Sequence, residues 1–211
     1  MYLPKHFDQT DRALALEVMR THNFAMLVGN DEAGAPYISH LPLVVSSADE
    51  NAGGTIRIEG HVAKPNQHWR ILQARPQALA VFQGPHAYLS PRMYPDLMRV
   101  PTWNYIAIHA YGEAKLVEDP VGKDALLKRL IGIHEPAYAQ QWRDLGEEYQ
   151  QKMLMGIVGF EITVTKLEAK FKMNQHRKEA HATTYAAYSQ GNPNERELAQ
   201  WMERLGLTGQ A

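Results

Sequence analysis

The segment GHVAKPNQHW, residues 60–69, concentrates polar side chains that could bind an anion. It holds two histidines, a lysine, an asparagine and a tryptophan in ten positions, directly after the alternating run TIRIE. His61 is therefore expected at the end of a β-strand, with Lys64 and Asn66 in the proline-containing turn that follows. Side-chain donors and backbone N–H groups in such a turn can form an anion-binding concavity. A solvated turn with an exposed lysine is the alternative that this segment alone leaves open.

A second group of residues, between positions 82 and 105, has the composition of a pocket for a planar ligand. Its aromatic members are Phe82, His86, Tyr88, Tyr94, Trp103 and Tyr105. Gln83, Thr102 and Asn104 supply amide and hydroxyl groups between them. This combination suits a flat heteroaromatic ring. Aromatic strands are also common in protein cores, so composition alone does not separate the two interpretations.

The segment KFKMNQHRK, residues 170–178, is a basic cluster that follows an apolar run. It contains Lys170, Lys172, Asn174, Gln175, His176, Arg177 and Lys178. These groups could donate hydrogen bonds to a phosphate or to a ring carbonyl. A solvated basic loop is the simpler interpretation, and contact with nucleic acid is a variant of it. Polar clusters after three different predicted strands favour a shared pocket.

The common catalytic and metal-binding motifs are absent from the sequence. The chain has no cysteine and no HxH, HxxxH or HExxH pattern, so we predict no metal site. It also lacks a GxSxG motif, a Walker loop and a GxGxxG fingerprint. Ser39 and His40 are adjacent on a predicted strand, where their side chains point to opposite faces. We therefore assign no catalytic residue.

Composition predicts a soluble globular protein. The 211 residues, of which 45% are hydrophobic, suit one generous domain with a real core. A formal net charge of −1 argues against a broad basic surface for nucleic acid. No window approaches the roughly 18 apolar residues of a membrane span, so no membrane contact is expected. The absence of cysteine fits a reducing cytoplasm, which we take as the predicted location.

The pattern of elements favours an antiparallel β-fold with peripheral helices. About six strands are expected, and none follows a βαβ rhythm. They are residues 24–30, 35–45, 55–62, 78–84, 102–119 and 157–171. Helical periodicity covers residues 8–22, 66–76, 121–135, 147–156 and 193–205. The proline-rich segment 84–101 is read as a loop, and residues 177–194 as a helix or a connection. A closed or split barrel is the natural architecture.

Several blocks of the sequence carry a family resemblance. They are MYLPKHF at residues 1–7, HLPL at 40–43, GHVAKPNQHW at 60–69, FQGPHAYLSP at 82–91, VPTWNY at 100–105, GIVGF at 156–160 and KMNQHR at 172–177. In this order they resemble the PaiB-type family of FMN-binding split-barrel proteins, commonly labelled negative transcriptional regulators. This family is similar in fold to the pyridoxamine-phosphate-oxidase-like flavin proteins. The family often has KLSQNR where this chain has KMNQHR, so Asn174 and His176 replace a serine and an asparagine.

The resemblance implies a mainly β, α+β fold: a six-stranded Greek-key split barrel that forms a homodimer with FMN at the subunit interface. It implies a barrel domain over residues 1–177 and a helical extension over 178–211, packed on or exchanged across the dimer. The implied cofactor-binding residues fall into four groups. They are His61, Lys64 and Asn66 at the FMN phosphate; Thr102 and Trp103 near the ring; Lys172, Gln175 and Arg177 completing the pocket, from the partner subunit; and His40 and Gln83 as weaker candidates.

The expected function is that of a PaiB-type FMN-binding protein and negative transcriptional regulator, acting directly or through flavin sensing. A flavin-dependent oxidoreductase of unknown substrate is the first alternative, and a haem-binding split barrel is the second. Direct DNA contact has little support, because no helix-turn-helix is evident and the last predicted helix is mixed in charge.

Overall fold

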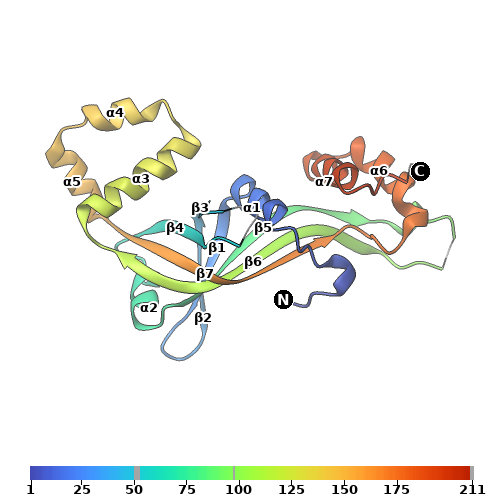
Figure 1. The fold of residues 1–211 in the computed structure, drawn as a ribbon, viewed down its shortest axis with the longest axis horizontal. Coiled ribbons are helices and arrows are strands. Elements are labelled where there is room, and N and C mark those ends of the chain that lie inside the picture. The colour runs from blue at the N-terminus through green and yellow to red at the C-terminus, as the bar shows by residue number, and fades with distance from the viewer. Residues whose placement is uncertain (50–52, 97, 210–211) are drawn as a thin grey trace. The chain divides into compact units, whose positions relative to one another are not determined.

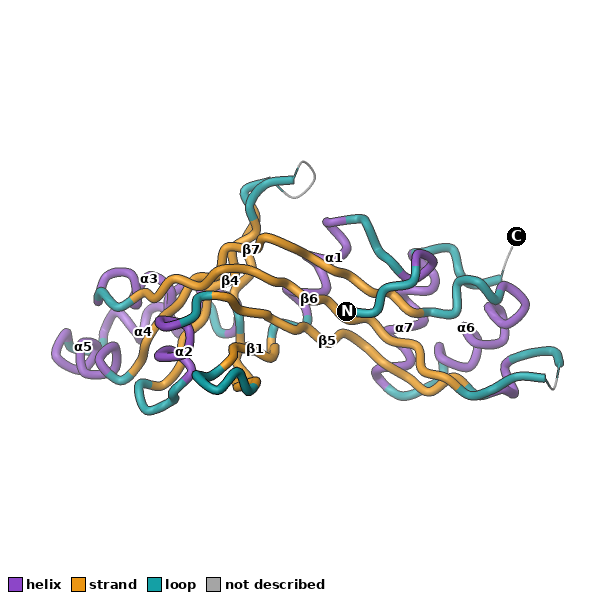
Figure 2. The backbone as a smooth tube through the Cα atoms, turned by 90° about the horizontal axis from the view of Figure 1, so that it is seen from below, coloured by secondary structure: helices purple, strands orange, loops and turns teal. Residues whose placement is uncertain are grey.

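The structure, a computed structural model, describes residues 1–49, 53–96 and 98–209 (Figure 1). Within these residues the chain forms an α+β fold with seven strands in one large antiparallel sheet and seven α-helices. The strands, orange in Figure 2, are β1 (Phe24–Asn30), β2 (Pro36–Pro42), β3 (Val44–Ser47), β4 (Ile56–Ala63), β5 (Gln77–Leu89), β6 (Thr102–Val117) and β7 (Ile157–Lys172).

The described helices follow the predicted pattern and add one that was not predicted, α4. The α-helices are α1 (Arg12–Thr21), α2 (His68–Ala74), α3 (Pro120–His134), α4 (Tyr138–Asp144), α5 (Glu147–Met155), α6 (His181–Ser189) and α7 (Pro193–Arg204). Short 3-10 helices are η1 (Lys5–Phe7), η2 (Pro91–Met93) and η3 (Lys178–Ala180). No helix among the described residues is both long and apolar enough to span a membrane.

The run expected as one strand over residues 35–45 is split in two at Leu43. β2 pairs with β1, with Pro42 opposite Phe24, whereas β3 pairs with β4. Pro42 has no N–H to donate to a ladder, so the chain changes partners directly after it. The prediction of six strands is therefore wrong, because the described residues form seven.

The order of the strands in the sheet requires its two edges to come together. The strands lie in the order β2-β1-β5-β6-β7-β4-β3, so β2 and β3 occupy opposite edges. Leu43 alone separates these two strands in the chain, and one residue spans only about 3.5 Å. The strands therefore curl until the two edges meet at Leu43, whose side chain is completely buried.

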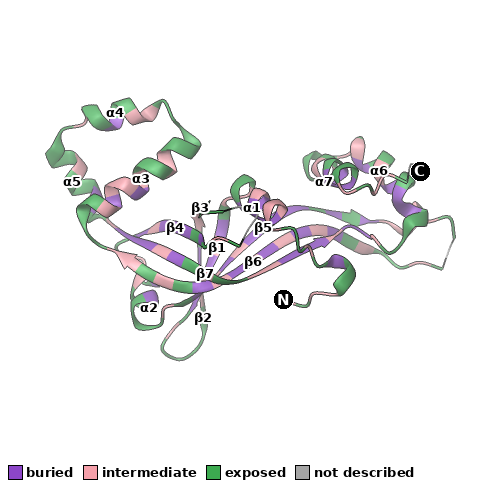
Figure 3. Cartoon of the chain, in the orientation of Figure 1, coloured by how far each residue is buried: buried purple, intermediate pink, exposed green. Residues whose placement is uncertain are grey.

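A glycine permits the close packing at this junction. A Cβ added to Gly60 of β4 would lie 2.7 Å from a methyl carbon of Leu43 and 2.7 Å from the ring of Phe160. Atoms do not approach so closely, so the position requires a residue without a side chain. Further buried residues, purple in Figure 3, lie along β4 and β7. Among them, Ile58 and Ile162 are completely buried.

The chain groups into two compact units, each built from several segments. Unit 1 contains Met1–Asp11, Gln83–Ile108 and Glu168–Ala211, and unit 2 contains Arg12–Phe82 and His109–Leu167. The family resemblance implies a division at one point of the sequence, into residues 1–177 and 178–211. This division stays a prediction.

In unit 2, the helices α3, α4 and α5 follow β6 and precede β7 in the chain, and they form a group (Figure 1). Asp119 caps α3 by accepting from the N–H of Gly122 at 2.7 Å, and Pro120 occupies its first turn, as predicted. The buried Lys123 donates from Nζ to the carbonyl of Leu154 at 2.5 Å, near the C-terminal end of α5. Because terminal carbonyls of a helix lack intrahelical donors, the ammonium satisfies one of them.

Two ion pairs in unit 2 differ in exposure and allow a matched stability prediction. Arg129 of α3 holds Glu59 of β4 through two hydrogen bonds, one of 2.8 Å from Nε to Oε2, and the Glu59 side chain is only 11% exposed. Arg57 contacts Glu161 at 3.0 Å with side chains that are 56% and 27% exposed.

Replacing Arg129 with methionine is expected to lower the free energy of unfolding by about 1–2 kcal/mol, because it leaves a nearly buried carboxylate unpaired. The Arg57→Met change should cost under about 1 kcal/mol, since exposed pairs contribute little. Urea unfolding of both variants measures the difference. Equal losses would show that the Glu59 pair is as well solvated as the Glu161 pair.

In unit 1, helices α6 and α7 lie side by side (Figure 1). α7 begins with the predicted capping box, in which Asn192 and Glu195 exchange side-chain and backbone hydrogen bonds. Trp201 of α7 meets Phe171 of β7 edge-to-face, with ring centroids 5.2 Å apart. Residues 177–194, the least certain segment of the sequence, thus form η3, α6 and the start of α7.

The proline-rich segment 84–101 is not wholly a loop. β5 continues through Pro85 to Leu89 and places Ala87 and Leu89 in the core. A proline inside a strand is tolerated where its missing N–H is not needed by a neighbouring strand. β1 pairs with β5 only over residues 79–81, so one side of β5 is free of that partner at Pro85.

Candidate functional site

The turn after β4 in unit 2 is held by backbone contacts and by one tryptophan. Lys64 donates its N–H to the carbonyl of Gly156 at 2.8 Å, and the carbonyl of Lys64 accepts from the indole Nε1 of Trp69 at 2.9 Å. Asn66 closes the turn through its N–H to Ala63 at 2.8 Å. The backbone on both sides of the Lys64 side chain is therefore fixed, while the side chain itself is exposed.

Asn66 is the centre of a hydrogen-bond network. Its Oδ1 accepts from the backbone N–H of His68 at 2.9 Å and from the hydroxyl of Tyr37 at 3.2 Å. Its Nδ2 donates to Ser39 Oγ at 3.1 Å. Because both ends of the amide are engaged, Asn66 shapes the turn and has little capacity left for a ligand.

His68 completes this network and was missed by sequence reasoning. Its side chain is completely buried, its Nδ1 lies 2.9 Å from Ser39 Oγ, and its ring meets Tyr37 edge-to-face at 5.2 Å. Asn66 already donates to the Ser39 oxygen, so the serine hydroxyl donates onward to Nδ1. Burial lowers the pKa of His68 to about 4, which keeps the imidazole neutral. The Asn66-x-His68 spacing, typical of an Asx turn, is the signal that could have indicated this role.

The two predicted histidines of unit 2 have different environments. His61 is half-buried on β4, and its Nδ1 has no hydrogen-bond partner within the part of the chain that the structure describes. Burial lowers the pKa of His61, so a neutral ring is favoured. His40 is exposed on β2, with its ring stacked 6.5 Å from that of Phe24.

Unit 1 brings three of the predicted residues to one pocket. Thr102, Lys172 and Arg177 line a cavity of about 410 Å³. Lys172 donates from Nζ to Thr102 Oγ1 at 2.6 Å and to the carbonyl of Trp103. Burial of the ammonium, and then the nearby charge of Lys170, lower the pKa of Lys172. An anion in the pocket would reverse this effect by favouring the charged form.

The other predicted residues of unit 1 do not line this cavity. Gln175 folds back on the backbone, because its Oε1 accepts from the N–H of Met173 at 2.9 Å and its Nε2 donates to the carbonyl of Phe171. Gln83 is exposed, with Nε2 at 3.4 Å from His86 Nδ1. Trp103 is 52% exposed, and its ring lies 6.3 Å from that of His86.

Two asparagines in the same cavity were not predicted as one site. Asn104 donates from Nδ2 to the hydroxyl of Tyr188 at 3.3 Å, which leaves its Oδ1 without a partner among the described residues. Asn174 has a backbone φ of 60°, in the left-handed region, and its buried Nδ2 is likewise unpartnered in that part of the chain. Both side chains line the cavity and are over nine-tenths buried.

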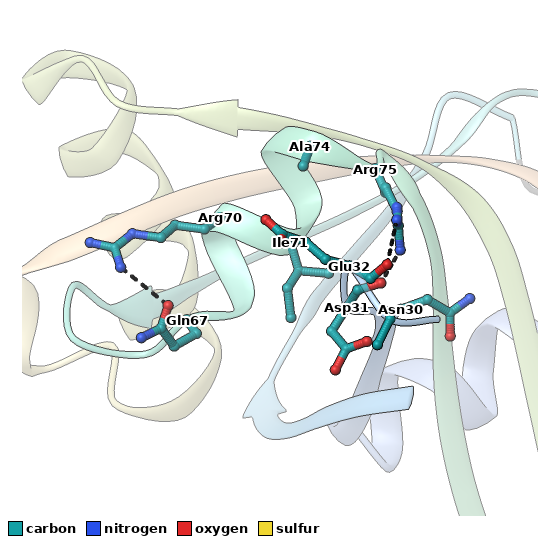
Figure 4. Close-up of a pocket in the computed structure, with 9 residues that line it drawn as sticks. Asn30, Asp31, Glu32, Gln67, Arg70, Ile71, Ala74 and Arg75 are labelled. Carbon is teal, nitrogen blue, oxygen red and sulfur yellow. Dashed lines mark hydrogen bonds between the residues drawn. The ribbon is translucent and has the colours of Figure 1, made fainter. Parts of the chain in front are cut away.

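A second hollow, of about 540 Å³, lies in unit 2 beside α2 and contains no predicted site residue (Figure 4). Arg75 closes one side by donating to the carbonyls of Asp31 and Glu32, and Arg70 donates to Gln67 Oε1 at 3.1 Å. The two cations that line this hollow are thus engaged with protein oxygens. Elsewhere too, the described residues contain no cluster of three or more His, Asp or Glu side chains placed to hold a metal ion.

Comparison with known proteins identifies the family. Residues 1–166 match the family described as "Putative FMN-binding domain". The chain is 35% identical over 210 residues to the Protease synthase and sporulation protein PAI 2 of Bacillus subtilis strain 168, covering 96% of this chain and 97% of that protein.

Solved structures share the fold at low sequence identity. The flavocytochrome Anf3 from Azotobacter vinelandii superposes with a TM-score of 0.59 at 13% identity, covering 80% of this chain and 70% of that one. The FAD and heme binding protein from Mycobacterium smegmatis gives a TM-score of 0.58 at 14% identity, covering 79% and 74%. The resemblance drawn from the sequence is thereby confirmed: the chain belongs to the PaiB-type family of FMN-binding domains, whose cofactor is FMN.

Proposed function

We propose that the FMN phosphate binds at the β4 turn of unit 2, with Lys64 as its cationic partner. The observation that carries this proposal is an exposed lysine side chain on a turn whose backbone is fixed on both sides by Gly156 and Trp69. A positioned ammonium forms strong, charge-assisted hydrogen bonds with phosphate oxygens. Lys64 forms no ion pair within the described residues, so its charge is available for a ligand.

Two neighbouring residues support a phosphate at this turn: one as a possible donor and one by positioning the backbone. His61 offers the Nδ1 atom that lacks a protein partner within the described chain, and it can serve as a donor when that nitrogen carries the proton. Asn66 positions the turn through Ser39 and His68 instead of contacting the ligand. FMN would supply redox chemistry when bound, while these residues bind and orient it.

The ring end of FMN is assigned from exposure and from the family resemblance, in which residues of the partner subunit complete the pocket. Trp103 presents an aromatic face to solvent beside Thr102, as a residue that packs on a planar ring would. Of the three residues predicted in the 172–177 segment, Lys172 and Arg177 retain capacity for a ligand. Gln175 is engaged with its own backbone and is the weaker candidate. His40 and Gln83, both exposed, are secondary candidates.

The proposed assembly is a homodimer of Greek-key split barrels, with residues 178–211 as a helical extension of each. The curled strands of unit 2, whose edges meet at Leu43, support a barrel. Exposed aromatic residues such as Phe24 and Trp103 support burial against a second copy. Sedimentation should give twice the 23.9 kDa of the chain, and a single species at the monomer mass would contradict the dimer.

The proposed cellular role is negative transcriptional regulation through flavin occupancy. The Bacillus relative is named for protease synthesis and sporulation, which supports a regulatory role. The helix α7 carries a capping Glu195 and charges of both signs, unlike a helix that reads the major groove. The fold likeness to flavocytochromes does not favour an oxidoreductase or a haem protein over this role.

Binding to the DNA upstream of the protein's own gene tests how regulation operates. We expect no sequence preference in fluorescence anisotropy between about 50 and about 200 mM salt, because a net charge of −1 offers few phosphate contacts. A shuffled DNA of the same length is the control. Tighter binding to the upstream DNA, with a steep salt dependence, would establish direct repression and contradict the indirect route.

A further inference from the structure

Lys123, at the end of the first turn of α3, is a buried lysine whose place in the helix does not explain it. It is only 8% exposed, and it follows the capping Asp119 closely in the chain. Cations are unfavourable near the N-terminus of a helix, because the helix dipole is positive there. A buried ammonium also needs hydrogen-bond partners in place of water. A lysine at this position therefore indicates a partner outside its own helix.

The partners of Lys123 lie on both sides of one glycine. Its Nζ donates to the carbonyl of Leu154 at 2.5 Å and to the carbonyl of Ile157 at 3.4 Å. Leu154 is in the last turn of α5 and Ile157 begins β7, so Gly156 alone separates the two elements. Carbonyls at the C-terminal end of a helix favour a cation. The ammonium thus holds the junction between α5 and β7.

The same junction holds the turn after β4. The carbonyl of Gly156 accepts the N–H of Lys64 at 2.8 Å, and Ile157 pairs with Ala63, the last residue of β4. Peptide groups are planar, so only a few soft dihedrals connect the carbonyl of Gly156 to the two carbonyls that Lys123 holds. The direction of the Gly156 carbonyl, and with it the backbone of Lys64, therefore depends on Lys123.

We propose that Lys123 positions the phosphate-binding turn by holding the α5–β7 junction to which the backbone of Lys64 is bonded. The inference rests on the proposed function, in which Lys64 receives the FMN phosphate. Lys123 acts through Gly156 and is a positioning residue, because its own ammonium is engaged with protein carbonyls. A turn that is already ordered presents the Lys64 ammonium at a lower entropic cost than a mobile one.

Lys123→Met tests the proposal, because methionine is a flexible, unbranched residue without the ammonium. We expect FMN binding to weaken about 3- to 10-fold, since ordering a mobile segment on binding costs affinity on this scale. Riboflavin binding should be unchanged, because riboflavin has no phosphate to contact the turn. Titrations followed by flavin absorbance measure both affinities. An unchanged ratio of FMN to riboflavin affinity would refute the positioning role.

Leu126→Ala is the control for general loss of stability. Leu126 lies on the same helix and is 1% exposed, and its Cδ1 is 3.3 Å from the place of a Cβ on Gly159 of β7. Its truncation loosens the packing of α3 on β7 but leaves the hydrogen bonds of Lys123 in place. We expect easier unfolding with the FMN-to-riboflavin ratio of the unaltered protein. The same selective loss of FMN in this variant would contradict a specific role for Lys123.

Amide hydrogen exchange of the flavin-free protein measures the link without any ligand. The amide of Lys64 should exchange at least about fivefold faster in Lys123→Met, because its bond to Gly156 opens more often. The amide of Ala114 in the same unit bonds to the carbonyl of Pro76 at 2.7 Å and should keep its rate. Equal acceleration of both amides, or no acceleration at Lys64, would overturn the inference.

Combining Lys123→Met with Lys64→Ala separates the two possible failures. If Lys123 acts through Lys64, the effects are not additive, and Lys123→Met should cause no further loss of FMN affinity in the Lys64→Ala protein. An undiminished further loss would show a different route and refute the inference. A selective loss in Lys64→Ala without one in Lys123→Met refutes this inference alone. If Lys64→Ala keeps full FMN affinity, the phosphate proposal fails and the inference fails with it.

Discussion

Replacing Lys64 with alanine is expected to weaken FMN binding about 10- to 100-fold while leaving riboflavin binding unchanged. A hydrogen bond to a charged group contributes about 1.5–3 kcal/mol, and each 1.4 kcal/mol corresponds to about tenfold in affinity. Riboflavin has the same ring without the phosphate, so it cannot gain from the ammonium. Titrations followed by the shift of the flavin absorbance spectrum measure both affinities.

The control for this change is Lys152→Ala. Lys152 is an exposed lysine on α5, and alanine is favourable in a helix. We expect its FMN affinity to match that of the unaltered protein. A parallel loss of FMN and riboflavin in Lys64→Ala would assign the lysine to the ring or to folding and contradict a phosphate role. Retention of both would remove Lys64 from the site.

Lowering the pH from about 7.5 to about 5 is expected to reduce the free energy of unfolding by about 2 kcal/mol through His68 alone. Its pKa is lowered from 6.5 to about 4 by burial. Between these values the unfolded chain binds a proton at this residue and the native chain does not. Stability therefore falls as the pH drops below 6.5, and this contribution levels off below about 4.

The His68→Asn variant separates this effect from ordinary loss of packing. Asparagine keeps a polar group facing Ser39 but does not titrate, so the difference in stability between the two pH values should shrink by about 2 kcal/mol. Leu72→Ala in α2 is the control, because Leu72 is 2% exposed and its truncation costs about 2–5 kcal/mol at either pH. Urea unfolding of the unaltered protein and of both variants at the two pH values measures these six free energies. An unchanged pH difference in His68→Asn would show that the pKa of His68 is nearly the same in the native and unfolded states.

Local sequence signals predicted most of the elements because each has a nearby physical cause. The alternation in TIRIEGHV predicts β4, and Asp119-Pro120 predicts the start of α3. The capping box at Asn192 predicts the start of α7. Each depends on residues within a few positions of one another, so the sequence contains the whole interaction.

The errors lie where a distant partner decides. Nothing near Pro42 indicates that the next residues pair with β4 and not with β1, and the six-strand prediction fails for this reason. Pro85 was predicted to lie in a loop, because the sequence does not show that β1 pairs with β5 only over residues 79–81. Strand partners are set by the whole sheet, and single-sequence patterns do not include them.

The sequence indicated which residues lie at the candidate site more reliably than it indicated what each of them contacts. Thr102, Lys172 and Arg177 do line one cavity, and Lys64 does sit on an exposed turn. Asn66 was predicted as a ligand donor because nothing near it in the sequence shows that the distant residues Tyr37 and Ser39 occupy its amide. The FMN contacts themselves stay predictions until they are measured.

The left-handed backbone at Asn174 has a consequence for how this position can change over evolutionary time. With φ at 60°, a residue other than glycine, asparagine or aspartate adds about 1–2 kcal/mol of strain. A serine at this position would meet this penalty in the present backbone. A change to serine thus lowers stability unless the backbone after β7 also changes, whereas a change to glycine or aspartate adds less strain.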